Sequence, residues 1–229
     1  MGRLFLASGA IAILCAVGSE VPLLSAVMPA PQAQSAAASI NNEPHYKRLL
    51  YTDDLRLWDV TLPAGQSTSP FVHEYDVATV VIGDGLSASS PNARGSVSVS
   101  EHTGAPAAYR IDNSGTTEYR ALEIENVHEG GWAAAQPFTA PGSSVLKESR
   151  AFTIYDVLLK AGSPETMHQH AGSTIVVLVG GALQQGGIGG TDPVRISQPG
   201  QWLSLPRFQA HALARVGNTD AHAIEIEVR

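Results

Sequence analysis

Two histidines one residue apart are the side chains of this sequence best placed to do chemistry. His168 and His170 lie in GSPETMHQHAG (162–172), just before the apolar run TIVVLV. Side chains alternate between the two faces of a strand, so both imidazoles point the same way, and Thr174 joins them. An exposed polar strand would give the same pattern, but the apolar run places the pair beside a buried strand. The pair is therefore a candidate for metal binding.

An earlier part of the chain repeats this stretch. LWDVTLPAGQSTSPFVHEYDVATVVIG (57–83) aligns without a gap with IYDVLLKAGSPETMHQHAGSTIVVLVG (154–180). AYRIDNSGTTEYRALEIE (108–125) aligns in the same way with AHALARVGNTDAHAIEIE (210–227). Two gap-free blocks in the same order indicate an internal duplication, with a period much longer than that of solenoid repeats.

Both copies predict strands rather than helices. TIVVLVGG and VATVVIGDG are typical of buried strands that end in glycine turns, and HAIEIEVR and YRALEIEN alternate as half-buried strands do. The chain has 22 Gly and 14 Pro, and only 15% of its residues are charged. We expect an all-β fold of two tandem β-barrels or jelly rolls, at 39–132 and 146–229, joined by a linker at 133–145 after a leader at 1–38.

The motifs resemble those of the cupin superfamily, and the whole chain resembles a two-domain bicupin. The matching positions are Gly162, His168, His170 and Gly181 of the first cupin motif and Gly200, Pro206 and His211 of the second. Thr174, Phe208 and Arg215 stand where the family has Glu, Gly and Asn. The resemblance covers about 46–127 and 146–229, and its motifs are stronger in the second copy.

The resemblance implies that His211 lies across the barrel from His168 and His170. Three neutral imidazoles on one face would hold a divalent first-row metal ion (Fe, Mn, Ni, Cu or Zn) and leave positions open for water or substrate. Most metal cupins have a carboxylate where this chain has Thr174. Without a carboxylate, the ion keeps its full double charge and favours an anionic or chelating ligand.

Two further residues are candidates for the surroundings of this site. Glu165 faces away from His168 by strand parity, and a bulge at Pro164 would be needed to turn it inward. Trp202 is most simply explained by core or domain-interface packing; because it lies four residues before Pro206, it is also a candidate, with Thr174, for lining the pocket.

The first copy has lost most of these groups. By the alignment, Phe71 stands where His168 is and Tyr109 where His211 is, and only His73 remains. One imidazole does not hold a metal, so this degenerate barrel is predicted to be metal-free, either as a structural partner that packs as subunits do in cupin dimers or as a pocket for another ligand. The remaining histidines, His102, His128 and His222 among them, are expected in loops or on outward strand faces.

Charge and the first residues bear on partners and location. The formal net charge of −7, with no basic run beyond Lys47-Arg48, argues against nucleic acid or anionic lipid as a partner. The apolar run at 4–17 is shorter than the roughly 20 residues of a membrane span. It predicts a cleaved signal peptide and export to the periplasm or outside the cell. The one cysteine, Cys15, would leave with that peptide, so no disulfide or thiolate site is expected.

Three functions follow from these observations. The first is a metal-dependent enzyme, dioxygenase-like or an isomerase or lyase, that acts on a small polar or anionic metabolite; the resemblance permits the dioxygenase because three-histidine cupins include oxygen-using enzymes on iron. The second is an exported, non-catalytic protein that binds a sugar or other small molecule. The third is a structural module with vestigial histidines. The resemblance is also compatible with a homodimer.

Overall fold

A computed structural model describes residues 37–83, 85, 93–104, 106, 108–128, 138, 140–161, 167–187 and 193–229. These residues contain strands and one short 3-10 helix, η1 (Ile40–Asn42), and none of them forms an α-helix. In this part of the chain there is accordingly no helix with the length and apolar character needed to cross a bilayer. Residues 1–36 of the leader, Pro164 and Glu165 lie outside the described residues.

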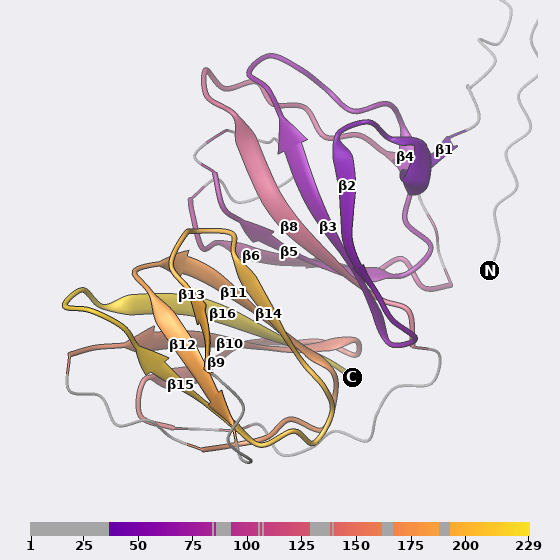
Figure 1. The fold of residues 1–229 in the computed structure, drawn as a ribbon. Coiled ribbons are helices and arrows are strands. Elements are labelled where there is room, and N and C mark those ends of the chain that lie inside the picture. Colours follow the sequence, from indigo (N-terminus) through magenta and orange to yellow (C-terminus); the bar gives the residue numbers. More distant parts are fainter. Residues whose placement is uncertain are drawn as a thin grey trace, which may run out of the picture. The chain divides into compact units, whose positions relative to one another are not determined.

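The N-terminal half forms two sheets (Figure 1). A five-stranded sheet has the order β2-β3-β8-β5-β6, and a three-stranded sheet has the order β1-β4-β7. Their bounds are β1 (Ala38–Ser39), β2 (Tyr46–Tyr51), β3 (Leu55–Leu62), β4 (Phe71–Val72), β5 (Asp76–Val81), β6 (Val97–Ser100), β7 (Ala108–Tyr109) and β8 (Tyr119–Asn126).

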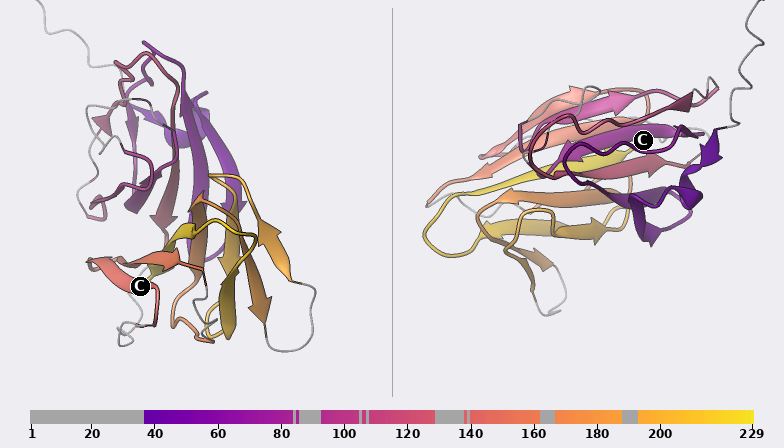
Figure 2. Two further views of the ribbon diagram at one scale, coloured as in Figure 1. Left: turned by 90° about the vertical axis from the view of Figure 1, so that its left-hand side faces the viewer. Right: turned by 90° about the horizontal axis from the view of Figure 1, so that it is seen from above.

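The C-terminal half has the same plan, seen from two more directions in Figure 2. Its five-stranded sheet has the order β9-β10-β16-β11-β14, and its three-stranded sheet has the order β13-β12-β15. The bounds are β9 (Ser143–Glu148), β10 (Phe152–Leu159), β11 (Thr174–Gly180), β12 (Leu183–Gly187), β13 (Val194–Ile196), β14 (Trp202–Leu205), β15 (His211–Arg215) and β16 (Ala221–Val228). β9 therefore begins inside the segment that the sequence predicted as a linker.

The largest hydrophobic cluster joins the two halves. Its fully buried members come from β3, β5 and β8 of one five-stranded sheet and from β10, β11 and β16 of the other; they include Leu57, Val80, Leu122, Ile124, Ile154, Val177, Ile224 and Ile226. Each such side chain contributes about 1.5–3 kcal/mol by leaving water. The two halves consequently belong to one compact unit that spans 36–229.

The strands β8 and β16 are buried on both faces, so the expectation of half-buried strands is wrong. On β16, Ile224 and Ile226 pack into the cluster between the halves. The alternate residues, Glu225 and Glu227, are only 1% and 6% exposed. The apolar face of β16 packs against the five-stranded sheet of the other half. Its polar face therefore points into the interior of its own half. This inversion of the usual pattern supplies buried carboxylates to each half.

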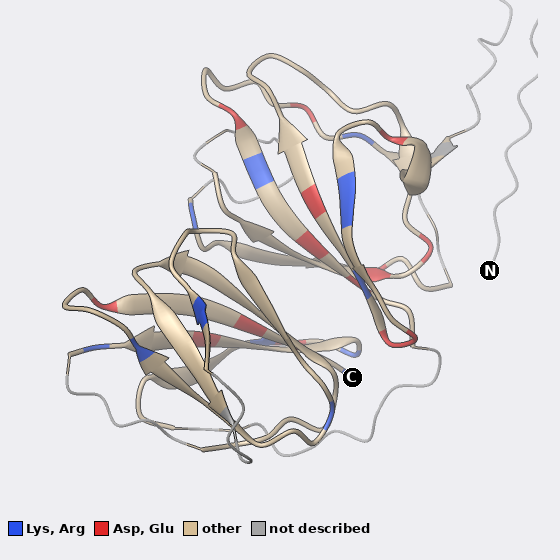
Figure 3. Ribbon diagram, in the orientation of Figure 1, with Lys and Arg blue, Asp and Glu red and all other residues tan. Residues whose placement is uncertain are grey.

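Charged residues of both signs are spread over strands of both halves (Figure 3). One ion pair bridges the halves: Asp76 of β5 accepts hydrogen bonds from Nε and Nη2 of Arg150 at 2.9 and 3.0 Å. Asn126 of β8 adds a second link by donating to the carbonyls of Ala151 and Arg229. Asp76 and Asn126 are cross-strand partners, so these polar contacts lie side by side and join the same ends of the two sheets.

Candidate metal centre

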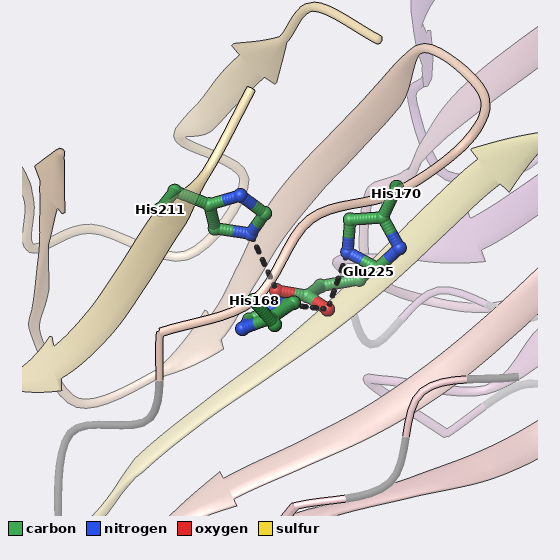
Figure 4. A group of neighbouring side chains, drawn as sticks. All are labelled: His168, His170, His211 and Glu225. Atoms are coloured by element: carbon green, nitrogen blue, oxygen red, sulfur yellow. Dashed lines mark ion pairs between the residues drawn. The ribbon is translucent and has the colours of Figure 1, made fainter. Parts of the chain in front are cut away.

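Four side chains of the C-terminal half converge on one point (Figure 4). They are His168, His170, His211 and Glu225, and their ligand atoms all lie within 4.8 Å of one another. His168 and His170 come from the segment that leads into β11, His211 is the first residue of β15, and Glu225 is on β16. The structure thus brings together the three histidines that the sequence singled out and adds a carboxylate to them.

Backbone pairing holds the histidines in place. His168 and His211 form an isolated antiparallel bridge, in which each amide donates to the other's carbonyl at 2.9 and 2.8 Å. The amide of Phe208 donates to the carbonyl of His170 at 2.8 Å. Phe208 has a φ of 57°, in the left-handed region, at the position where the cupin motif has glycine. A phenylalanine is strained there, and the bond to His170 compensates for part of that cost.

Glu225 was missed by the sequence interpretation, which found threonine at the position of the family's carboxylate, Thr174, and considered only Glu165 as a substitute. Its Oε2 lies 3.4 Å from Nε2 of His170 and 3.7 Å from Nε2 of His168, and its Oε1 lies 4.0 Å from Nε2 of His211. The expectation that a bound ion would keep its full double charge is therefore wrong for this geometry. The signal was present in the sequence, because both repeats end in Glu-Ile-Glu.

The electrostatics of the cluster favour the metal-binding protonation state of Glu225 and His211 and oppose it for His170. Burial raises the pKa of Glu225, but the neighbouring imidazoles of His168 and His170 outweigh it and lower this pKa to about 2. Burial lowers the pKa of His211 to about 4, with help from the other two imidazoles. Burial also acts to lower the pKa of His170, but Glu225 and Glu227 outweigh it and raise this pKa to about 9. At neutral pH Glu225 is ionised and His211 is neutral, as metal ligands must be.

Buried ligand atoms without hydrogen-bond partners show that the group fits a cation. Nε2 of His170, Nε2 of His211 and both carboxylate oxygens of Glu225 are shielded from solvent and make no hydrogen bond. Buried polar atoms are rarely left in this state, and four of them facing one point are explained by an ion that all of them bind. Three imidazoles and one carboxylate suit a divalent first-row metal ion.

A second carboxylate, that of Glu227, orients His170 by contacting Nδ1, the ring nitrogen that faces away from the metal-binding group. Oε2 of Glu227 lies 3.4 Å from Nδ1 of His170 and accepts a hydrogen bond from the Tyr155 hydroxyl at 3.0 Å. Its Oε1 accepts from the amides of Ala171 and Gly172 at 2.9 and 3.0 Å. Glu227 thus fixes the imidazole ring and the loop that carries it, as outer carboxylates do for histidine ligands in metal sites.

The N-terminal half contains one histidine between two carboxylates, as His170 lies between Glu225 and Glu227, but it lacks the other two histidines. Nδ1 of His73 lies 2.7 Å from Oε1 of Glu125, and its Nε2 lies 3.2 Å from Oε2 of Glu123. Burial acts to lower the pKa of His73, but these two carboxylates outweigh it and raise the pKa to about 9. Phe71 and Tyr109 face each other across β4 and β7, as His168 and His211 do across their bridge. Among the described residues, the metal-binding group lies in the C-terminal half.

A small cavity adjoins the centre. It has a volume of about 20 Å³, and its lining residues include His168, Glu225, Phe138, Leu159 and Leu213. The ring of Phe138 is stacked on the imidazole of His168, with centroids 3.9 Å apart and an angle of 10° between the planes. The accessible side of the centre is therefore narrow and largely apolar.

The structure bears differently on the three residues that were considered as neighbours of the site. Thr174 is fully buried, and its hydroxyl donates to the carbonyl of Gly172 at 3.3 Å. Trp202 does not line the cavity; it pairs with Val177 and packs against the cluster between the halves. Glu165 lies outside the described residues.

One of the other histidines is also corrected by the structure. His102 was expected on the surface, but it is 8% exposed and lies 5.6 Å from Tyr109, ring centroid to ring centroid, in a stacked arrangement. His222 is partly exposed, with its Nε2 2.6 Å from Oδ1 of Asp156, and His128 is partly exposed. None of these three belongs to the metal-binding group.

Three solved structures illustrate the proteins whose fold is similar to that of this chain. A cupin 2 conserved barrel domain protein from Leptotrichia buccalis has a TM-score of 0.55 and 14% identity, covering 80% of this chain and 88% of that chain. AerE from Microcystis aeruginosa has a TM-score of 0.56 and 11% identity, covering 82% and 98%. Salicylate 1,2-dioxygenase from Pseudaminobacter salicylatoxidans has a TM-score of 0.60 and 12% identity, covering 80% and 75%.

Comparisons of sequence found no match for this chain, whereas comparisons of structure did. No protein-family model and no curated protein sequence matches the chain. The structural likeness extends over about four-fifths of the chain and includes a protein described as a cupin. Together with the order of the strands, it shows that this chain has the cupin fold.

Proposed function

We propose that this chain is a metal-dependent enzyme that binds one divalent first-row ion through His168, His170, His211 and Glu225. Its substrate is a small molecule whose polar or anionic group approaches the ion and whose carbon skeleton contacts the apolar wall. The reaction class is oxidation by molecular oxygen, with both oxygen atoms entering the product and no external reductant. The apolar run at 4–17 supports the further proposal that the protein is exported.

The observation that carries this proposal is the convergence of four buried ligand atoms that have no hydrogen-bond partners. Leaving so many buried polar atoms unsatisfied costs roughly 1–3 kcal/mol each. Such an arrangement persists when a function requires it. An ion in this position would satisfy all of them at once.

Each residue has a defined part in this function. His168, His170 and His211 donate imidazole nitrogens, and Glu225 adds a negative charge that lowers the net charge of the centre. Four protein ligands leave up to two positions free on a six-coordinate ion. When bound, the ion supplies Lewis acidity and, if it is redox-active, electron transfer to oxygen. Val157, Leu159 and Leu213 line the cavity and keep bulk water from the reacting groups.

Similarity to the dioxygenase supports the oxidative reaction over isomerisation or C–C cleavage. A variant of salicylate 1,2-dioxygenase was solved in complex with gentisate, and its TM-score to this chain is 0.58. In that protein, therefore, the same fold supports a dioxygenase and binds a small acidic ligand. The identity of 12% carries neither its substrate nor its residues over to this chain.

A non-catalytic binding function is the second candidate, and the small cavity favours it. A space of about 20 Å³ accommodates little more than a water molecule. A protein that captures a metal ion and holds it enclosed needs no more room than this. In that case the bound species would be the ion itself or a small complex of it.

Oxygen consumption by the metal-loaded protein tests the enzymatic proposal. The purified chain is loaded in turn with Fe²⁺, Mn²⁺, Ni²⁺, Cu²⁺ and Zn²⁺ and supplied with a panel of small hydroxy and keto acids. We expect uptake of one O₂ per substrate with a redox-active ion, and loss of that uptake in His211→Ala. Tight metal binding with no uptake and no new product by mass spectrometry would favour the binding protein.

A further inference from the structure

We infer that Phe138 determines the size of the ligand that can reach the metal centre. The inference rests on the proposed function, since it assigns a role to a residue that contacts a ligand of the metal but donates no ligand atom itself. Phe138 precedes β9 and reaches the C-terminal half from the segment between the two halves. It packs against the hydrophobic cluster inside that half.

The stacking geometry places the ring where a ligand would enter. Its plane is within 10° of the His168 imidazole plane at a centroid distance of 3.9 Å, which is face-to-face contact. His168 and Glu225, two members of the metal-binding group, line the same cavity as Phe138. A ligand that approaches from this cavity therefore passes beside the phenyl ring.

Much of the remaining apolar wall belongs to packed strands. Val157, Leu159 and Leu213 come from strands of the C-terminal half, whereas Ala140 and Pro141 precede β9, as Phe138 does. Val157, Leu159 and Leu213 are at most 6% exposed. Side chains held in sheets yield less readily than one side chain that precedes the first strand of the half.

Phe138 is also connected to the carboxylate that orients His170. Its amide donates to the hydroxyl of Tyr155 at 3.4 Å, and that hydroxyl donates to Glu227. The position of the phenyl ring is thus linked through two hydrogen bonds to the support of a metal ligand. Ligands one atom wide can pass with the ring in place, whereas planar rings must displace it from His168.

Ligand binding to the cobalt-loaded chain tests this inference without measuring catalysis. The visible absorption of bound Co²⁺ responds to changes in its ligands, so it reports the binding of azide, a linear anion, and of imidazole, a planar ring. Both are titrated into the wild-type chain, Phe138→Ala and Leu146→Ala. Leu146 is 49% exposed on β9 and does not line the cavity, so its variant is a matched control.

We expect imidazole to bind Phe138→Ala at least about tenfold more tightly than the wild-type chain, because its ring can occupy the space beside His168. Azide should bind the two proteins with similar affinity, and Leu146→Ala should behave as the wild-type chain. An intermediate imidazole affinity for Phe138→Leu would show that the effect follows side-chain size.

The contradicting outcomes separate the two proposals. Equal imidazole affinities for wild-type and Phe138→Ala, both loaded with Co²⁺, overturn the role of Phe138 and leave the metal centre standing. Loss of Co²⁺ in Phe138→Ala alone also overturns the size limit, because the ring would then be needed to form the site. Failure of the wild-type chain to bind Co²⁺ at all overturns the proposed function.

Discussion

Thr174 of β11 and Glu227 of β16 are direct cross-strand partners, and both are buried inside the C-terminal half. Thr174 occupies the position where the cupin motif has its carboxylate, yet Glu225 and Glu227 supply carboxylates from the neighbouring strand. Adjacent strands are only about 4.8 Å apart, so a carboxylate on β16 reaches the same histidines. In this chain the carboxylate of the centre therefore comes from β16, the strand next to the one that carries Thr174.

Glu225→Gln tests whether this relocated carboxylate is a ligand. Glutamine has nearly the same shape but no charge, so we expect the affinity for a divalent ion to fall by at least about 100-fold, more than the loss of an outer partner causes. Competition titration against a chelator measures it. Glu148→Gln, at a side chain that is 46% exposed on β9, should leave the affinity unchanged. Equal affinities for both variants would remove Glu225 from the centre.

Metal binding should release a proton, because His170 is protonated at neutral pH in the metal-free chain. Its pKa of about 9 lies above its ordinary value, so a bound proton must leave before Nε2 can coordinate. Affinity should therefore rise with pH, by about tenfold per unit, and level off above pH 9. Calorimetry in buffers of different ionisation enthalpy counts the protons released.

Glu227→Gln provides the control for that pH dependence. Removing this carboxylate withdraws one of the two groups that raise the pKa of His170. The plateau of affinity should then begin at a lower pH than in the wild-type chain. An affinity independent of pH between 6 and 9 in the wild-type chain would contradict the assignment of the proton to His170.

The ion pair of Asp76 with Arg150 should make the free energy of unfolding fall in acid. Burial acts to raise the pKa of Asp76, but Arg150 and the amides of Thr103 and His102 outweigh it and lower this pKa to about 2. The stabilisation is complete above pH 3.8, the ordinary value, and disappears as the pH falls through 2. It amounts to about 2 kcal/mol in the free energy of unfolding. Denaturation of Asp76→Asn between pH 5 and 2 should show a flatter dependence, whereas the exposed Asp53→Asn should follow the wild-type chain.

The N-terminal half should accept a metal ion after two substitutions. His73 and Glu123 already lie 3.2 Å apart, and Phe71 pairs with Tyr109 as His168 pairs with His211. Phe71→His with Tyr109→His supplies the two missing imidazoles on the same strands. We expect elemental analysis to find a second ion per chain in the double variant and not in either single one. A folded double variant that binds no additional ion would show that the two interiors differ in more than these two positions.

Alternation along strands is a local property, so the sequence predicted the all-β fold and the pairing of His168 with His170, whereas the placement of His211 beside them came from the resemblance to the cupin motifs. The sequence predicted the wrong environment for the Glu-Ile-Glu endings, since alternation reports two different faces but not which of them meets another sheet. Glu225 was overlooked for that reason: the face assigned to solvent is interior, and the apolar face packs on the other half. The burial of His102 likewise depends on contacts between segments distant in the chain.

Metal stoichiometry tests the central claim most directly. The full chain is incubated with each first-row divalent ion, dialysed and analysed for metal content, beside His168→Ala and His211→Ala, whose folding is verified by circular dichroism. One tightly held ion per wild-type chain, absent from both variants, is the predicted result. A wild-type chain that retains no ion, or variants that retain as much as the wild-type chain, would contradict it.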